Sequence, residues 1–359
     1  MGLPKHKENT INTIVAIVPA HNEQDTIEQA VCDLIAQTRR PDRIIVIADN
    51  CTDRTVEIVQ VFTQSWPCVE VFATENNQNR KAGAINQVLE TLSDEVNYVL
   101  LMDADTSLGE HAIEIAANYL EAHQDTAAVC SRAGVQDIHD GATLFERLLH
   151  RLQRIEYAMA DSQRIERPGA IRCIHGMAAM HRFKMLQRVG FYNVASIVED
   201  YHLTIAYKEC GYKAATDLDM RAWTLVPTNL RDWWQQRVRW SRGAMDTLRE
   251  YGWSDVTRSE ILLYFLMAAI DLTRSTFYGL LLFYLFASPA PIRFHPACII
   301  TLSIYLMDIL YRMKYVEDAS VADYMIRLLL IPDLLYYYLR AIVRYYSYIL
   351  SFLNTPQDW

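Results

Sequence analysis

The first 130 residues alternate short apolar runs with amphipathic segments, and this alternation is the strongest constraint on the fold. Four apolar runs predict buried strands: 13–20, 42–49, 69–75 and 98–105. Three segments with helical periodicity predict the helices that follow the first three strands: 23–37, 52–64 and 81–92. Strands that alternate with helices in this way predict a parallel sheet joined by right-handed crossovers, and therefore an α/β fold.

Polar residues follow each of the four predicted strands. They are His21 to Glu23, Asp49 to Cys51, Asn76 to Lys81 and Asp103 to Asp105. In open α/β sheets, ligands bind outside the carboxyl ends of the strands. The sequence therefore predicts a binding site along this edge of the sheet.

Asp103 and Asp105 end the fourth predicted strand, with one alanine between them. Alternate residues of an extended segment point to the same side, so both carboxylates can reach one object. Neighbouring carboxylates raise each other's pKa unless a cation lies between them, and Mg²⁺ or Mn²⁺ prefers such oxygen ligands. The alternative is a plain strand-to-loop turn, which the same residue types also favour.

Composition and charge exclude several classes of protein. The chain has 359 residues and a formal net charge of −9, which argues against nucleic acid as a partner. Its seven cysteines show no C-x-x-C spacing, which indicates reduced thiols rather than disulfides or a zinc site. The polar start "MGLPKHKENTINT" does not resemble a signal peptide. We therefore expect a cytoplasmic catalytic domain, either at the inner face of a membrane or soluble.

Two more motifs lie further along the chain. In "IVEDYHL", Glu199 and Asp200 open a predicted amphipathic helix, and "QRVRW" at residues 236–240 fits the pattern Q-x-x-R-W. Each has a simpler explanation, as a helix N-terminus and as an ordinary helix face. Their order relative to the aspartates is what distinguishes them.

Seven motifs occur in a fixed order: "PAHNE", "ADNCTDRT", "NRKAGAIN", "DAD", "HGMAAMHR", "VEDYHL" and "QRVRW". Together they resemble the inverting glycosyltransferases of family 2, in particular the catalytic domains of cellulose, chitin and hyaluronan synthases. The resemblance implies the GT-A fold, which is Rossmann-like with a mostly parallel sheet flanked by helices. It also implies three regions: a polar tail at 1–10, a catalytic domain at 11–250, and a helical apolar region at 251–359.

The resemblance also implies roles for residues on the donor side. Pro19, Ala20 and Glu23 would line the nucleotide pocket, and Asp49 would recognise the uracil and ribose. The residues that would shape the diphosphate and sugar site are Lys81, Gly83 and Asn86. Asp103 would face the donor and Asp105 would bind a divalent metal, Mn²⁺ or Mg²⁺, to which Asp103 would also contribute.

On the acceptor side, the resemblance implies a platform formed by Gly176, Met177 and Ala178. Asp200 matches the catalytic base, with Glu199 beside it. The residues that would close over the diphosphate and the acceptor are Gln236, Arg239 and Trp240. A base and a metal suit this reaction, because the acceptor hydroxyl must lose a proton and the leaving diphosphate gains negative charge.

The expected function is the metal-dependent transfer of a sugar, with inversion, from a nucleotide-diphosphate donor such as a UDP-sugar to a hydroxyl group. The acceptor could be a glycan, a lipid-linked carrier or a protein. Two departures leave donor and acceptor open: Ala48 replaces the first aspartate of a common pair, and no hydroxyl residue follows Gly176. The alternatives are a non-catalytic nucleotide-sugar-binding scaffold and a nucleotidyltransferase. The latter usually needs a Gly- and Lys-rich phosphate loop, and "PAHNEQDTI" is not one.

The last third of the chain is rich in apolar and aromatic residues. Apolar stretches occur at 261–286, 297–311 and 326–353, the last of them dense in tyrosine with Arg340 and Arg344 on one face. Tyrosine and arginine suit a membrane interface, and they also suit packing between helices. We therefore expect membrane contact through residues 256–353, with a homo-oligomer contact as the alternative.

Overall fold

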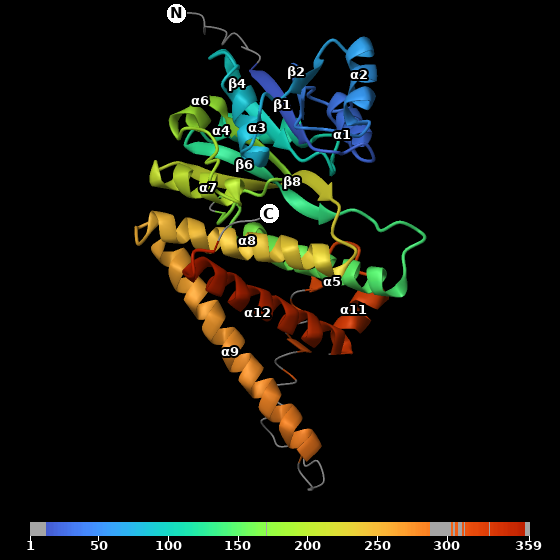
Figure 1. Cartoon of the computed structure of the whole chain (residues 1–359), viewed down its shortest axis with the longest axis vertical. Helices are drawn as coiled ribbons and strands as arrows, with labels where there is room; N and C mark the ends of the chain where they lie inside the picture. Colours follow the sequence, from blue (N-terminus) through green and yellow to red (C-terminus); the bar gives the residue numbers. More distant parts are fainter. Residues whose placement is uncertain are drawn as a thin grey trace, which may run out of the picture. The chain divides into compact units, whose positions relative to one another are not determined.

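The computed structural model describes residues 12–169, 171–287, 303, 306–307, 311, 313–329 and 331–355. The predicted tail at 1–10 lies outside the described residues, as does most of the apolar stretch at 297–311. Figure 1 shows the arrangement of the elements along the chain.

A mixed sheet organises the first part of the chain. Within the described residues its eight strands have the order β3-β2-β1-β4-β7-β6-β8-β5. Their bounds are β1 Thr13–Ala20, β2 Arg43–Ala48, β3 Val69–Ala73, β4 Val96–Met102, β5 Thr106–Leu108, β6 Thr126–Val135, β7 Ala178–Arg182 and β8 Lys213–Thr224. Strands β3, β2, β1 and β4 are parallel, while β7 pairs antiparallel with β4 and with β6.

The helices complete the α/β pattern that the sequence predicts. Their bounds are α1 Ile27–Ile35, α2 Thr55–Ser65, α3 Arg80–Leu89, α4 Ala112–Ala122, α5 Leu144–Glu166, α6 Phe183–Arg188, α7 Glu199–Glu209, α8 Leu230–Tyr251, α9 Arg258–Ala287, α11 Val321–Leu328 and α12 Ile331–Phe352. The predicted strands at 13–20, 42–49 and 69–75 and the three helices that follow them are confirmed, with ends that differ by a few residues.

One local prediction is wrong. The fourth strand ends at Met102, so Asp103 and Asp105 lie in a turn rather than in an extended segment. The turn is closed by a hydrogen bond of 3.1 Å from the Thr106 amide to the Asp103 carbonyl, and β5 begins at Thr106. The two carboxylates are therefore presented by a tight turn, and the alternation of a strand does not explain their placement.

The chain divides into two compact units. Unit 1 holds the described residues up to Arg132, with Gly169–Val194 and Cys210–Trp223. Unit 2 holds Ala133–Pro168, Ala195–Glu209 and the described residues from Thr224 onward. The chain thus passes between the units several times before residue 250. The predicted domain boundary at 250 stays a prediction.

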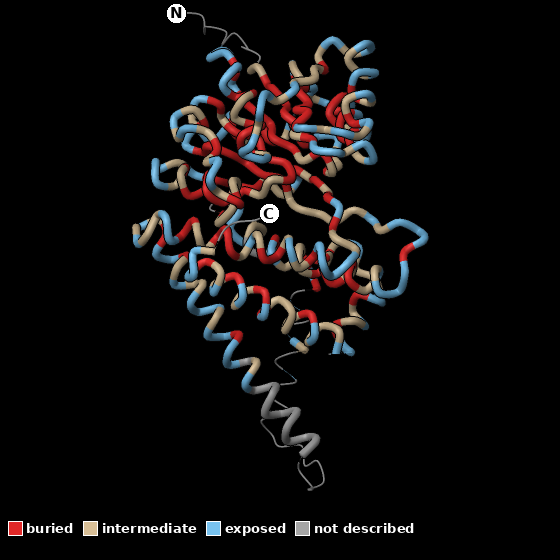
Figure 2. The backbone as a smooth tube through the Cα atoms, in the orientation of Figure 1, coloured by how far each residue is buried: buried red, intermediate tan, exposed pale blue. Residues whose placement is uncertain are grey.

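The core of unit 1 is the sheet itself. Figure 2 shows that burial is concentrated along its strands, and Val15, Ile17, Ile44, Ile47 and Leu100 have almost no exposed surface. Continuous apolar strands of this kind are typical of a parallel sheet covered by helices on both faces. The sheet therefore gives a rigid base for the turns at the ends of its strands.

Unit 2 is built on three long helices, α5, α8 and α12. Helices α8 and α12 run side by side (Figure 1), and a buried cluster joins all three: Leu149, Leu152, Trp233, Val238, Tyr336 and Val343. Helix α8 begins with a capping hydrogen bond of 2.9 Å from the Asp232 amide to the Asn229 side chain. The last long helix of the described chain therefore packs directly on the helix that carries the "QRVRW" motif.

The C-terminal region is helical, as predicted, and its helices expose many apolar side chains. On α9 these are Leu262, Phe265, Leu266, Ile270 and Leu272, and on α12 they are Ile331, Leu335, Ile342, Tyr346, Ile349 and Phe352. Arg340 and Arg344, by contrast, are ion-paired inside unit 2, with Glu156 and Asp271. Among the helices of the described residues, none is both long and apolar enough to cross a membrane.

Candidate active site

The end of β1 lies beside the end of β2 in unit 1. The parallel register pairs Pro19 with Ile47 and Ala20 with Ala48. The Asp49 amide donates a hydrogen bond of 2.9 Å to the Ala20 carbonyl, and the His21 ring donates one of 2.6 Å to the Asp49 carbonyl. The structure therefore brings the predicted nucleotide-pocket residues Pro19 and Ala20 next to Asp49.

The carboxylate of Asp49 is buried and is held by three donors. Thr74 Oγ1 and Asn50 Nδ2 donate to Oδ1 at 2.8 and 3.0 Å, and Asn77 Nδ2 donates to Oδ2 at 2.9 Å. A carboxylate has about four lone-pair positions. Among the hydrogen bonds of the described residues, one acceptor position on Oδ2 is left. Asp49 can therefore accept one more N–H or O–H donor in a fixed direction.

The loop between β3 and α3, which supplies the donors Thr74 and Asn77 to Asp49, is tightly folded. Asn76 and Arg80 have positive φ angles of 48° and 55°, which non-glycine residues rarely adopt. Asn77 Nδ2 donates a second hydrogen bond, of 2.8 Å, to the Arg80 carbonyl. A Cβ on Gly83 would lie 2.4 Å from Asn77 Oδ1, so glycine is required here for the loop to close.

A cluster of charges surrounds the turn after β4. Lys81, in the first turn of α3, forms an ion pair with Asp103. Burial, followed by the charges of Asp103 and Glu23, raises the pKa of Asp105 to about 6. Burial also raises the pKa of Glu23, and the charge of Asp103 contributes to that increase. The structure therefore brings Glu23, Lys81, Asp103 and Asp105 together, and their role at a donor stays a prediction.

The predicted platform residues lie against this turn. Strand β7 pairs with β4 so that Ala178 is opposite Met102, and the Asp103 amide donates a hydrogen bond of 3.0 Å to the Met177 carbonyl. Gly176 immediately precedes them in the chain. A segment about seventy residues downstream thus fixes the backbone of the aspartate turn.

Asn86 has a structural contact that the sequence does not reveal. Its Nδ2 donates a hydrogen bond of 2.8 Å to the Tyr192 carbonyl, and its Oδ1 accepts one of 3.1 Å from the Tyr192 amide. Both ends of the amide therefore hold a loop of unit 1. A direct role for Asn86 at the sugar stays a prediction.

The predicted base lies in unit 2, at the start of α7. The Asp200 carboxylate accepts a hydrogen bond of 2.7 Å from the Tyr201 amide, and Glu199 is the first residue of the helix. Arg239 of α8 donates a hydrogen bond of 3.3 Å to the Ile197 carbonyl, just before this helix begins. A Cβ on Gly243 would lie 2.6 Å from Val198 Cγ2, so α8 and this segment are in close contact. One face of α8 therefore positions the Glu199-Asp200 pair.

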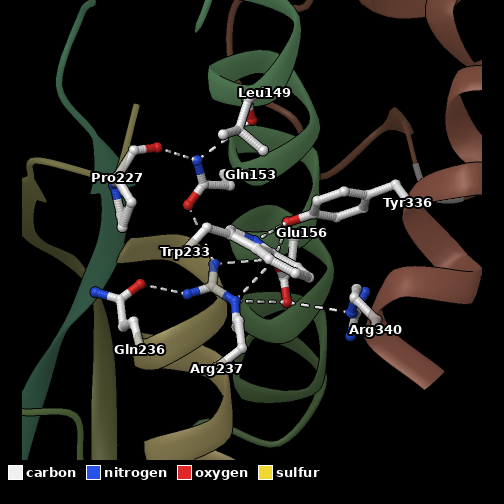
Figure 3. A network of polar contacts seen from close by, with 9 residues as sticks. All are labelled: Leu149, Gln153, Glu156, Pro227, Trp233, Gln236, Arg237, Tyr336 and Arg340. Atoms are coloured by element: carbon white, nitrogen blue, oxygen red, sulfur yellow. Dashed lines mark hydrogen bonds and ion pairs between the residues drawn. The ribbon is translucent and has the colours of Figure 1, made fainter. Parts of the chain in front are cut away.

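Gln236 and Trp240 lie on α8 on either side of Arg237, a residue for which the sequence motifs predict no role. Gln236 Oε1 accepts a hydrogen bond from Arg237, whose guanidinium lies 4.4 Å from the centre of the Trp240 ring. Arg237 is buried and pairs with Glu156 of α5 (Figure 3). The only signal in the sequence is that Arg237 lies within "QRVRW", and nothing local indicates its partner.

Asp103 and Asp105 are the carboxylates of the turn after β4 that could contribute to a divalent-cation site, and the described residues alone do not complete one. No three His, Cys, Asp or Glu side chains among the described residues form a group that could hold a metal. Mg²⁺ and Mn²⁺ sites commonly take one or two carboxylates and fill the remaining positions with water and substrate phosphates. Burial is the main cause of the raised pKa of Asp105, followed by the charges of Asp103 and Glu23, and a bound cation would lower that pKa.

Comparison with known proteins identifies the domain. Residues 15–190 match the family model described as "Glycosyl transferase family 2". Two similar proteins are poly-beta-1,6-N-acetyl-D-glucosamine synthases, one from Staphylococcus epidermidis, 26% identical over 270 residues, and one from Staphylococcus aureus strain MSSA476, 27% identical over 269 residues. These alignments cover 74% of this chain and 62% of each relative, so the chain spans less than two thirds of their length.

A solved structure with a similar fold is the mannosyltransferase PcManGT from Pyrobaculum calidifontis, in complex with GDP-Man and Mn²⁺. It matches with a TM-score of 0.63 and 18% identity, over 97% of this chain and 89% of that chain. At this identity the likeness shows the fold alone, and it confirms the predicted GT-A architecture. From the sequence match and the shared fold, we conclude that this chain carries a glycosyltransferase domain of family 2 over residues 15–190.

Proposed function

We propose that this protein transfers a sugar from a nucleotide-diphosphate donor to a hydroxyl acceptor, with inversion at the anomeric carbon. The observation that carries the proposal is the charge cluster after β4, where Lys81 pairs with Asp103 and the pKa of Asp105 is raised to about 6. An amine and two carboxylates gathered at one turn suit a diphosphate with its cation. The proposal assigns donor binding to unit 1 and the acceptor chemistry to residues of unit 2.

A uridine diphosphate sugar is the donor that Asp49 favours. Its remaining acceptor position on Oδ2 suits the N3–H of uracil, whereas the corresponding edge of cytosine offers an unprotonated nitrogen. The relatives named poly-beta-1,6-N-acetyl-D-glucosamine synthase make N-acetylglucosamine the first sugar to test. GDP-mannose, which the structural neighbour binds, belongs in the same panel as the competing donor.

Asp105, with Asp103, would hold a Mn²⁺ or Mg²⁺ ion. When bound, such an ion supplies positive charge to the diphosphate oxygens. Lys81 supplies a positive charge from the protein. Its ammonium lies at Asp103 and can neutralise part of the charge that gathers on the departing diphosphate. Pro19, Ala20 and Glu23 would line the nucleotide pocket, and Gly83 leaves room for Asn77 and Asn79 of the preceding loop.

Asp200 is the proposed base, and Glu199 is the second candidate. The Asp200 carboxylate takes the proton of the acceptor hydroxyl, whose oxygen then bonds to the anomeric carbon. The bond from that carbon to the diphosphate breaks, and its electron pair leaves with the diphosphate. The amide of Tyr201 and the N-terminal end of α7 both stabilise an ionised Asp200, so it is ready to accept a proton.

The acceptor would rest on Trp240, which is 36% exposed. A glycan is the acceptor that the relatives' name suggests, and a lipid-linked carrier or a protein is the competing class.

The test is a donor panel that measures release of the nucleoside diphosphate with and without a β-1,6-linked N-acetylglucosamine oligosaccharide. We expect UDP-N-acetylglucosamine to give acceptor-dependent release that stops in EDTA and returns with Mn²⁺. Asp200→Asn should lower transfer by about 10²–10⁴-fold, the usual contribution of a general base, while UDP binding stays near that of the parent. Asp105→Asn should weaken binding and transfer together.

The matched control is Glu57→Gln, which removes an exposed carboxylate on α2 whose ion pair within the described chain is with its helical neighbour Arg54. It should leave transfer unchanged. Absence of acceptor-dependent release for every donor, in protein shown to be folded by its thermal transition, would refute the proposed function. Full activity of Asp200→Asn would leave the function standing and make Glu199 the base.

We also propose that the C-terminal region contacts a membrane through residues 256–353. The exposed apolar side chains of α9 and α12 support this, because large exposed apolar surfaces indicate interaction sites. Protein expressed in cells should sediment with membranes and resist extraction by high salt. Recovery as a detergent-free soluble dimer would instead support the homo-oligomer contact.

A further inference from the structure

A buried carboxylate in unit 2 is shared by two arginines and a tyrosine. Glu156 of α5 accepts hydrogen bonds from Arg237 of α8, at 3.0 to 3.3 Å, and forms an ion pair of 3.2 Å with Arg340 of α12. Tyr336 of α12 also donates a hydrogen bond to it (Figure 3). Three helices that are far apart in the sequence therefore meet at one charged group.

Arg237 is held on several sides. Its Nε and Nη2 both bond to Glu156, and its Nη1 donates to Gln236 Oε1. A guanidinium is planar and bonds through a rigid fork, so these contacts set the orientation of its plane as well as its position. Burial alone would raise the pKa of Glu156, but the two arginines outweigh this and lower it to about 2, so the carboxylate stays charged.

The fixed guanidinium lies against the indole of Trp240. Its carbon is 4.4 Å from the ring centre, close enough for a strong cation–π contact. Tyr157 meets the same ring edge-on, with 6.3 Å between the centroids. The guanidinium backs the indole, and the exposed part of the ring is available to a sugar.

Helix α12 packs against α8, the helix that carries Arg237 and Trp240. Trp233 Nε1 donates a hydrogen bond of 3.0 Å to Tyr336 Oη, and Tyr336 and Val343 belong to the same buried cluster as Val238 of α8. Arg340 lies on α12 one helical turn after Tyr336, so both reach Glu156 from one face. Contacts of α12 therefore reach Trp240 through Glu156 and Arg237.

We propose that Arg340 and Tyr336 of α12, acting through Glu156 and Arg237, are positioning residues that set the acceptor-binding face of Trp240. The C-terminal helix is then part of the acceptor machinery as well as a candidate membrane contact. This inference rests on the proposed function, because it assumes that Trp240 carries the acceptor sugar.

The test compares Arg340→Met with Arg344→Met. Arg344 lies one turn further along α12 and is also ion-paired, but with Asp271 of α9, so it is matched in chemistry and lies outside the Trp240 network. With UDP-N-acetylglucosamine and a β-1,6-linked N-acetylglucosamine oligosaccharide, Arg340→Met should raise the acceptor KM by about threefold to tenfold, within the range of couplings between residues of one network. Arg344→Met should leave the acceptor KM within about twofold of the parent, as expected for a residue outside the network.

Two further variants separate positioning from stability. Arg340→Lys keeps a cation for Glu156, so its acceptor KM should stay close to that of the parent. In a Trp240→Ala background, Arg340→Met should have no further effect on the acceptor KM, because the residue through which it acts is gone. An equal effect of Arg340→Met on the acceptor KM in both backgrounds would overturn the proposal. So would an increase in the acceptor KM of Arg344→Met that matches its loss of melting temperature, because the effect would then come from lost stability.

A second measurement does not depend on turnover. The chain has seven tryptophans, so 5-fluorotryptophan labelling gives a small set of ¹⁹F resonances in which Trp240 is assigned by Trp240→Phe. Arg340→Met and Tyr336→Phe should shift or broaden the Trp240 resonance, and Arg344→Met should not. An unchanged resonance in both network variants refutes the positioning role even if transfer is never detected. If the two network variants shift the Trp240 resonance but the parent protein transfers no sugar, the result contradicts the proposed function alone and leaves the positioning role in place.

Discussion

Replacing Gly243 by alanine tests how α8 positions the proposed base. Gly243 lies on α8, and a Cβ at this position would lie 2.6 and 2.7 Å from the two Cγ atoms of Val198 and 2.9 Å from Ile197 Cγ1. Real Cβ atoms essentially never approach this closely, so something in this contact must shift, and we expect the segment 197–198 to move away from α8. Glu199 and Asp200 follow directly in the chain. The substitution therefore displaces the base without altering any charge.

The expected change in the free energy of unfolding is the difference of two terms. Forcing an extra methyl group into a packed contact costs about 1–3 kcal/mol. Alanine in place of glycine in a helix interior stabilises by about 1 kcal/mol. We expect a net destabilisation of about 1 kcal/mol, or a decrease in Tm of about 2–4 °C. Transfer should fall much more than stability, by about tenfold or more, because a misplacement of about 1 Å can cost about 10²-fold.

The assay pairs this variant with Val198→Ala, which removes both clashing Cγ atoms. Val198 is buried, so Val198→Ala alone should be destabilising. In the double variant the two changes should compensate, so that its loss is smaller than the sum and transfer partly recovers. UDP binding should change little throughout, because the atoms that the new methyl group meets belong to Val198 and Ile197, and not to Asp49 or Asp105. Parent-level transfer by Gly243→Ala, or simple additivity of the two changes, would refute the reasoning.

The charged groups of the two units give three other predictions. The pKa of Asp105 lies above its value of 3.8 in an unfolded chain, so the metal-free protein should lose stability as pH rises from about 4 to about 6. For the same reason Mn²⁺ should raise Tm more at pH 7.5 than at pH 5. An equal effect of Mn²⁺ at both pH values would contradict this prediction. Asp49→Ala should remove the preference for UDP over ADP and GDP in thermal-shift titrations, and a parent that shows no preference would exclude the assigned role. Since the pKa of Glu156 is lowered to about 2, it contributes stability above about pH 4.5 that is lost as pH falls towards 2, and an acid titration of Glu156→Gln should show a smaller loss than the parent.

The sequence predicts well whatever depends on neighbours along the chain. Burial on both faces makes a parallel strand a continuous apolar run, and a crossover helix needs an apolar stripe. The strands β1 to β3 and the helices α1 to α3 can therefore be predicted from their hydrophobic patterns. The edge where these strands end is also predictable, because parallel strands end together. For this reason the amino-acid sequence is sufficient to name Asp49, Lys81, Asp103 and Asp105 as candidates for a site.

The structure decided how those residues are held. The turn at Asp103 depends on the Met177 carbonyl, which the antiparallel strand β7 supplies from far along the chain. Asn86 is predicted at the sugar site, yet its amide bonds both backbone groups of Tyr192. No periodicity records such pairings, because they join segments whose separation in the sequence is arbitrary.

Unit 2 shows the same limit more strongly. The amino-acid sequence alone determined that Gln236, Arg239 and Trp240 share a motif, and that the C-terminal third is helical and apolar. It could not reveal that Arg340 and Tyr336 meet Arg237 at Glu156, because a buried ion pair needs a partner in space and any acidic residue on any helix could supply it. Local residue patterns thus determine the elements and the strand ends, whereas long-range packing alone decides which buried charges are paired and which side chains they hold in place.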